Sequence, residues 1–223
     1  MPIYNAPILK IDAAETRRYA GMRNTADFDD EMIEDICESA RLLLEVKGIW
    51  KVYDYDCEKN LILSEPVFKI HGNSIEKHLQ GCEKVICMAV TVGEKIEQEV
   101  TREFKNGGYV ASMIMDAAAT AAVEQAADAT EKVIAQEIAK EGYKKIWRYS
   151  PGYGDWSLNE QKAFFQITDA KEIGMRLSPM LMLMPRKSIT AVIGLKKVTG
   201  DAEITDKKNS CADCEKVDCP ARN

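Results

Sequence analysis

Histidine is nearly absent: the 223-residue chain contains only two, His71 and His78. No H-E-x-x-H segment occurs, and two histidines leave little room for a catalytic triad. The chain also lacks a Walker-type glycine-rich loop and a G-x-G-x-x-G segment after a strand. Hydrolase and kinase functions therefore have no residues here to support them.

An excess of positive charge is missing too. The chain has 30 Lys and Arg against 36 Asp and Glu, a net charge of -6, so no global basic field attracts phosphates. Long apolar runs are also lacking: the least polar stretch, 109–127, contains Asp116 and Glu124 and makes a poor membrane span. We expect neither a nucleic-acid partner nor a membrane partner.

The first ten residues have no basic segment, so we expect no signal peptide and a cytoplasmic location. In that reducing compartment, clustered cysteines favour metal ligation over disulfides. Three of the seven cysteines crowd one short segment, at Cys211, Cys214 and Cys219. Their spacing suggests zinc or an iron–sulfur cluster, with the fourth ligand open among the other cysteines, the histidines and an exogenous group. A flexible tail with free thiols is the alternative.

Capping-box spacing predicts three helix starts, at 12–15, 91–94 and 157–160. The third is expected to open a helix ending near Gly174, and Ser74 is expected to cap one more helical turn. Apolar or alternating runs predict strands, at 49–56, 61–70, 85–90, 145–149, 180–184 and 188–195. The first two form a predicted hairpin and the last two a predicted antiparallel pair. Since helices and antiparallel strands interleave without a βαβ rhythm, the predicted class is α+β, an antiparallel sheet packed with helices.

The longest predicted helix runs to about Glu141 and contains the stretch 117–122, which has almost no side-chain bulk. We expect another element to pack close to it. Glu124 follows that stretch. Its carboxylate is either solvated or, if this face is buried, needs a positive partner.

The segment 148–156, RYSPGYGDW, is the densest cluster of unusual residues. Gly152 and Gly154 permit backbone geometry that brings N–H and C=O groups close to a ligand. Arg148 offers a rigid fork for a carboxylate or phosphate. Aromatic faces that can stack on a base or face a cation come from Tyr149, Tyr153 and Trp156. A Pro-Gly turn with aromatic packing is the purely structural alternative.

Three segments in order carry a family resemblance: 148–153 reads R-x-x-x-G-Y, 173–178 reads I-G-x-x-L-S, and 185–190 reads P-x-x-S-I-T. Over roughly 107–195 the chain resembles the reactivation domain of cobalamin-dependent methionine synthase. The family's tyrosine after the third segment has no counterpart in 193–196. A second family carboxylate lies one residue away from Glu141.

The resemblance implies binding of S-adenosylmethionine. Arg148 would hold the methionine carboxylate, and Glu124 would supply a carboxylate facing the ligand. The backbone around Ser150 and Gly152 would meet the adenosine. Tyr149 and Tyr153 complete the implied binding set. Such a site would align the S–CH₃ bond with cobalt and would need no general base, which agrees with the scarcity of histidine.

The implied function is reactivation in trans. Cob(II)alamin on the cobalamin-binding module of a separate methionine synthase would take an electron from a flavodoxin- or ferredoxin-like donor and a methyl group from S-adenosylmethionine. One alternative is reactivation of another corrinoid methyltransferase. Another is a metal-binding interaction or electron-transfer protein that works through its cysteines. We expect 1–106 to be the helical and hairpin part of the same domain, 107–199 the S-adenosylmethionine-binding part, and 200–223 a cysteine-containing tail.

Overall fold

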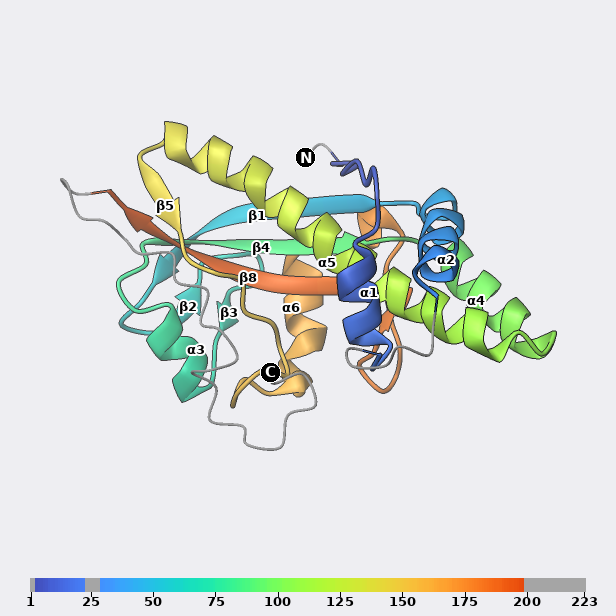
Figure 1. Cartoon of the computed structure of the whole chain (residues 1–223). Helices are drawn as coiled ribbons and strands as arrows, with labels where there is room; N and C mark the ends of the chain where they lie inside the picture. Colours follow the sequence, from blue (N-terminus) through green and yellow to red (C-terminus); the bar gives the residue numbers. More distant parts are fainter. Residues whose placement is uncertain (1–2, 23–28, 199–223) are drawn as a thin grey trace.

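The computed structural model describes residues 3–22 and 29–198. In this part of the chain, the predicted α+β class is confirmed: a six-stranded antiparallel sheet is packed with helices (Figure 1). The strand order is β3-β2-β1-β4-β8-β5. These strands are β1 (Lys47–Asp56), β2 (Leu61–Ile62), β3 (Phe68–Lys69), β4 (Lys84–Thr91), β5 (Tyr143–Lys145) and β8 (Ser188–Lys197). A separate two-stranded sheet joins β6 (Arg176–Leu177) to β7 (Leu183–Met184).

The central strand β4 is buried on both faces, as its apolar sequence predicts. Ile86 and Met88 point into the core beneath the long helix, whereas Val85 and Cys87 point into the core on the opposite side. This alternation follows from the two-residue period of a strand. Since β4 pairs with β1 on one side and β8 on the other, segments from both halves of the chain share one sheet.

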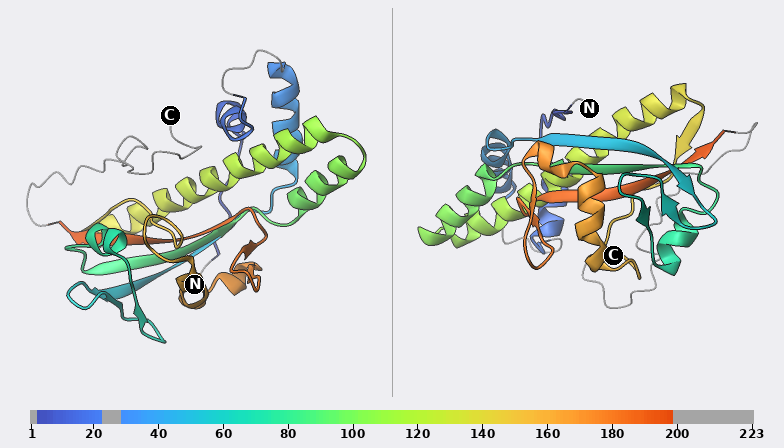
Figure 2. Two further views of the ribbon diagram at one scale, coloured as in Figure 1. Left: turned by 90° about the horizontal axis from the view of Figure 1, so that it is seen from below. Right: turned by 180° about the vertical axis from the view of Figure 1, so that it is seen from behind.

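One face of the sheet is covered by helices that pack around α5 (Figure 2). They are α1 (Ala13–Tyr19), α2 (Asp30–Leu42), α4 (Lys95–Lys105) and α5 (Tyr109–Lys140). The alanine-rich stretch of α5 faces the sheet, with Ala118, Ala122 and Ala126 each 0% exposed. A Cβ added at Gly48 of β1 would stand 2.9 Å from the Thr130 hydroxyl of α5. The full burial of Ala118 and Ala122 confirms the close packing expected at 117–122, and the contact of Gly48 with Thr130 extends it further along the helix.

Replacing Ala122 with leucine is expected to lower the free energy of unfolding by about 1–3 kcal/mol, because three extra carbons would overfill the contact between α5 and the sheet. Urea denaturation measures the effect. Ala139→Leu is the matched control on the exposed end of the same helix, where the change should stay within about 0.5 kcal/mol. Equal stability of the two variants would contradict tight packing at Ala122.

The opposite face carries smaller elements over an aromatic core. These are α3 (Asn73–His78), the 3-10 helices η1 (Leu158–Glu160) and η2 (Ala170–Ile173), and α6 (Gln161–Ile167). Trp156 is 1% exposed and meets Phe164 edge-on, with ring centroids 5.3 Å apart. Phe164 in turn contacts Phe68 of β3. This core supports the loop that leads from β5 to η1.

Several predicted boundaries were wrong. The second hairpin strand, expected over 61–70, is split into β2 and β3 because Pro66 offers no N–H to a ladder. The segment 180–184 does not pair with β8; its last residues pair with β6 instead. The helix expected to run to Gly174 is broken at Asp169, which has a φ of 54°.

Two predicted helix caps were also wrong. Ser74 does not cap α3, which begins at Asn73; the backbone N–H groups of both residues donate to the Asp155 carboxylate at 2.8 and 2.9 Å. Thr91 does not cap α4, because it is the last residue of β4 and its hydroxyl accepts from Gly93 N–H. Asp12, by contrast, caps α1 as predicted.

Candidate functional site

The candidate site is a pocket of about 420 Å³ beside one end of strand β8. Strand β5 pairs with β8 only as far as Lys145, and a single further bridge joins Tyr149 to Val192. The chain then turns away from the sheet, so the edge of β8 at 188–190 is left for the pocket, which these residues line. Because backbone groups alternate along a strand, Thr190 presents its N–H and C=O to the same edge as Val192.

The loop after Tyr149 forms one wall of the pocket. Gly152 N–H donates to the Trp156 carbonyl at 2.8 Å and Tyr153 N–H donates to the Ser150 carbonyl at 3.1 Å, which closes the loop on itself. Gly152 has a φ of 94°, a backbone conformation that glycine adopts readily. Ser150 and the 63%-exposed Tyr153 line the pocket. This Pro-Gly turn thus presents polar and aromatic groups together on the pocket wall.

Tyr149 has a different position from its neighbours. It is buried beneath the loop, where its ring lies 5.2 Å from Trp147 and 5.3 Å from His78. His78 contacts the Trp147 carbonyl through Nε2 at 2.8 Å, and burial lowers the pKa of this imidazole. Tyr149 therefore supports the pocket wall from inside, and neither Tyr149 nor Gly152 belongs to the described lining residues.

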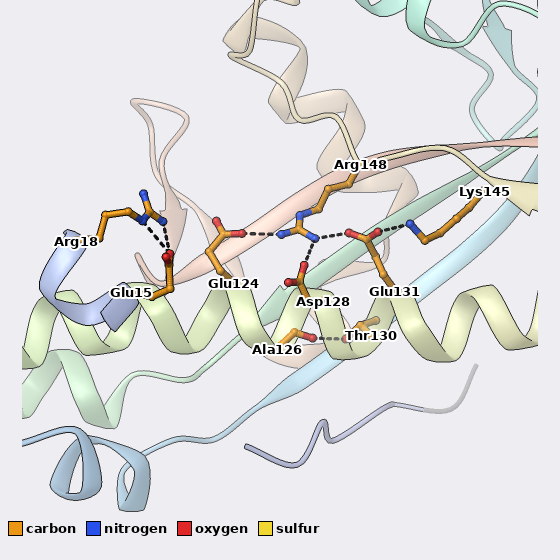
Figure 3. A network of polar contacts seen from close by, with 9 residues as sticks. All are labelled: Glu15, Arg18, Glu124, Ala126, Asp128, Thr130, Glu131, Lys145 and Arg148. Carbon is orange, nitrogen blue, oxygen red and sulfur yellow. Dashed lines mark hydrogen bonds and ion pairs between the residues drawn. The ribbon is translucent and has the colours of Figure 1, made fainter. Parts of the chain in front are cut away.

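Arg148 reaches across the site to a row of carboxylates on α5 (Figure 3). Its Nη2 donates to Glu124 at 2.6 Å, and its Nη1 donates to Asp128 at 2.6 Å and also to Glu131. The three acids are four and three residues apart, so one helix face presents them together. Lys145 pairs with the second oxygen of Glu131 at 2.9 Å. Of the two alternatives that the sequence left open for Glu124, the structure shows a positive partner, Arg148, although the Glu124 side chain stays 39% exposed.

Burial sets the electrostatics of this network. Desolvation acts to lower the pKa of Arg148, but Glu131 and the other carboxylates outweigh it and hold that pKa above its usual value. The Arg148 side chain is 20% exposed and that of Glu131 9%, whereas Glu124 and Asp128 are 39% and 44% exposed. The buried pair of Arg148 with Glu131 is therefore structural. The carboxylates of Glu124 and Asp128 remain accessible to a cationic group.

The other side of the pocket comes from α6 and the connection between β7 and β8. Gln161 is buried and its Nε2 donates to the Thr190 hydroxyl at 2.7 Å. Arg186 also lines the pocket, and its side chain is 47% exposed. The sequence motifs do not mark Asp128, Gln161 or Arg186 as site residues. Asp128 could have been found from its four-residue interval to Glu124, because residues four apart lie on the same face of a helix.

The predicted metal ligands Cys211, Cys214 and Cys219 lie outside the described residues. Within the described residues, no group of three or more metal-ligating side chains comes together. Cys37, Cys82 and Cys87 are buried there, and burial raises the pKa of the Cys82 thiol to about 11. None of the described helices combines the length with the apolar composition that a membrane span needs.

Comparisons with known proteins support the fold. No family model matches the sequence, and no curated protein matches it. Among solved structures, the chain is similar to the MetH reactivation domain bound to AdoHcy, with a TM-score of 0.52 and 13% sequence identity. The match covers 76% of this chain and 66% of that chain. At this identity the similarity shows a shared fold.

Proposed function

We propose that this chain binds S-adenosylmethionine in the pocket beside β8 and presents its methyl group to a corrinoid held by a separate protein. The observation that supports this most is the location of the Glu124–Arg148 network. It lines a pocket at the open edge of β8, in a fold similar to a reactivation domain whose structure contains AdoHcy. AdoHcy is the product that remains when S-adenosylmethionine loses its methyl group.

The residues present suit such a ligand. Glu124 and Asp128 offer partly exposed carboxylates for its ammonium and sulfonium charges. Trp147 and Tyr153 line the pocket and provide aromatic surface, to which cations and bases bind well. The pocket volume lies within the range usual for small-molecule sites. We propose that Arg148 acts mainly as a positioning residue, because its Nη groups already orient these carboxylates.

The proposed transfer needs alignment more than acid–base chemistry. The methyl group leaves sulfur without the bonding electron pair, which stays on sulfur and yields S-adenosylhomocysteine. The cobalt of the reduced corrinoid provides the pair for the new Co–C bond. Starting from cob(II)alamin, one electron from a flavodoxin- or ferredoxin-like donor must come first. We propose the cobalamin-binding module of a methionine synthase as the acceptor.

Titration calorimetry with S-adenosylmethionine and S-adenosylhomocysteine tests the proposal. The wild type is expected to bind both, and Glu124→Gln should weaken S-adenosylmethionine about tenfold more than S-adenosylhomocysteine, because only the former has the sulfonium charge; tenfold corresponds to about 1.4 kcal/mol.

Glu137→Gln, on the exposed far end of α5, is the matched control and should leave both affinities unchanged. Absence of S-adenosylmethionine binding to the wild type would contradict the proposed function. Equal losses for both ligands in Glu124→Gln would show that Glu124 does not sense the sulfonium.

A further inference from the structure

Two arginines line the pocket, and they differ in how their charge is already used. Arg148 donates to three carboxylates of α5 and is mostly buried. Arg186 has one ion pair within the described part of the chain, with Glu97 at 3.4 Å, and its side chain is 47% exposed. A ligand carboxylate approaching Arg148 would meet Glu124 and Asp128 beside it, and like charges at that distance repel. Among the described residues, Arg186 forms an ion pair with one acid, Glu97, instead of a row of three.

The neighbouring Lys187 has its charge used elsewhere. Its ammonium donates to Asp116 and to the Thr120 hydroxyl, both at 2.8 Å, and its backbone N–H donates to Glu97 at 2.9 Å. These contacts attach the connection between β7 and β8 to α4 and α5. Because Lys187 is held in this way, the backbone of the neighbouring Arg186 is anchored at the pocket wall.

We propose that Arg186 binds the α-carboxylate of the amino-acid part of the ligand, a role that the family resemblance would give to Arg148. This inference rests on the proposed function and makes it more specific. Glu124 on α5 and Arg186 on the β7–β8 connection line the same pocket from different elements. The amino-acid part of a ligand bound between these elements would have its carboxylate toward the Arg186 guanidinium, which is able to form a bidentate pair. Its ammonium would then face Asp128 and its sulfonium would face Glu124.

The test compares S-adenosylmethionine with its decarboxylated analogue, which keeps the sulfonium, the amine and the adenosine but lacks the carboxylate. The wild type is expected to prefer S-adenosylmethionine by at least tenfold, on the order of one charge-assisted hydrogen-bonded pair. Arg186→Gln should reduce this preference to roughly twofold while the affinity for the analogue stays at the wild-type value. Arg186→Lys should give an intermediate preference, since an ammonium cannot form the fork.

Arg176→Gln is the matched control: this arginine lies nearby on β6, is 68% exposed, and pairs with Glu94 outside the pocket lining. It should keep the full wild-type preference. A wild-type preference retained in Arg186→Gln would overturn the assignment, as would an equal loss of affinity for both ligands. Failure of the wild type to bind either ligand would instead contradict the proposed function itself, so the two failures are distinguishable.

Discussion

Replacing Arg148 with methionine is expected to lower the free energy of unfolding by about 3–5 kcal/mol, because three carboxylates of α5 would lose their shared cation. The unpaired charge of Glu131 would contribute most to this loss of stability, because its side chain is only 9% exposed to water. Lys145 would remain as its partner at 2.9 Å, yet one ammonium cannot neutralise the whole row. Urea denaturation at neutral pH measures the change in stability.

The matched control is Arg186→Gln, which removes a half-exposed arginine from the same pocket. Among the described residues, Arg186 has one ion pair, with Glu97 at 3.4 Å, and this distance is long. The change in the free energy of unfolding should therefore stay within about 0.5 kcal/mol. Adding Glu131→Gln to Arg148→Met should recover part of the lost stability, because one of the stranded charges is then removed. A loss below about 1 kcal/mol for Arg148→Met would show that solvent compensates the acidic row and that the network is not structural.

Replacing Trp156 with alanine is expected to cost about 3–5 kcal/mol of unfolding free energy, because a fully buried indole leaves a cavity. The ring lies between Tyr149 and Phe164, and its Nε1 donates to Glu160 at 2.6 Å. The loop 150–155 that walls the pocket closes on the Trp156 carbonyl, so ligand binding should be lost as well. Thermal or urea denaturation, followed by calorimetry under native conditions, measures both effects.

Tyr109→Ala truncates an aromatic residue that is 61% exposed and is not one of the pocket-lining residues, and should cost less than about 1 kcal/mol. Trp156→Phe keeps an aromatic ring but removes the indole N–H, so it should be intermediate in stability. If Trp156→Ala retained both wild-type stability and ligand affinity, the aromatic core could not be the support of the pocket wall.

The sequence by itself determined the helices and strands that have a clear local pattern of apolar or helix-forming residues. The length and composition of the apolar run 85–90 predicted a buried strand, and the helix from Tyr109 to Lys140 follows from its uninterrupted helix-forming composition. Its alanines also predicted close packing, because small side chains let backbones approach. The motif at 148–153 identified the loop that walls the pocket, since Gly152 and its neighbours are unusual in type as well as in spacing.

Only the tertiary structure decided which side chains meet. Asp155 caps α3 across 82 and 81 residues of sequence, and Arg148 pairs with acids up to 24 residues away. No local pattern encodes such contacts, because they depend on how β5 and α5 dock on the sheet. The early end of β5 likewise creates the open edge of β8, and with it the pocket. Residue types could therefore indicate a charged ligand site, but the competition of three carboxylates for Arg148 arises only when the chain is folded.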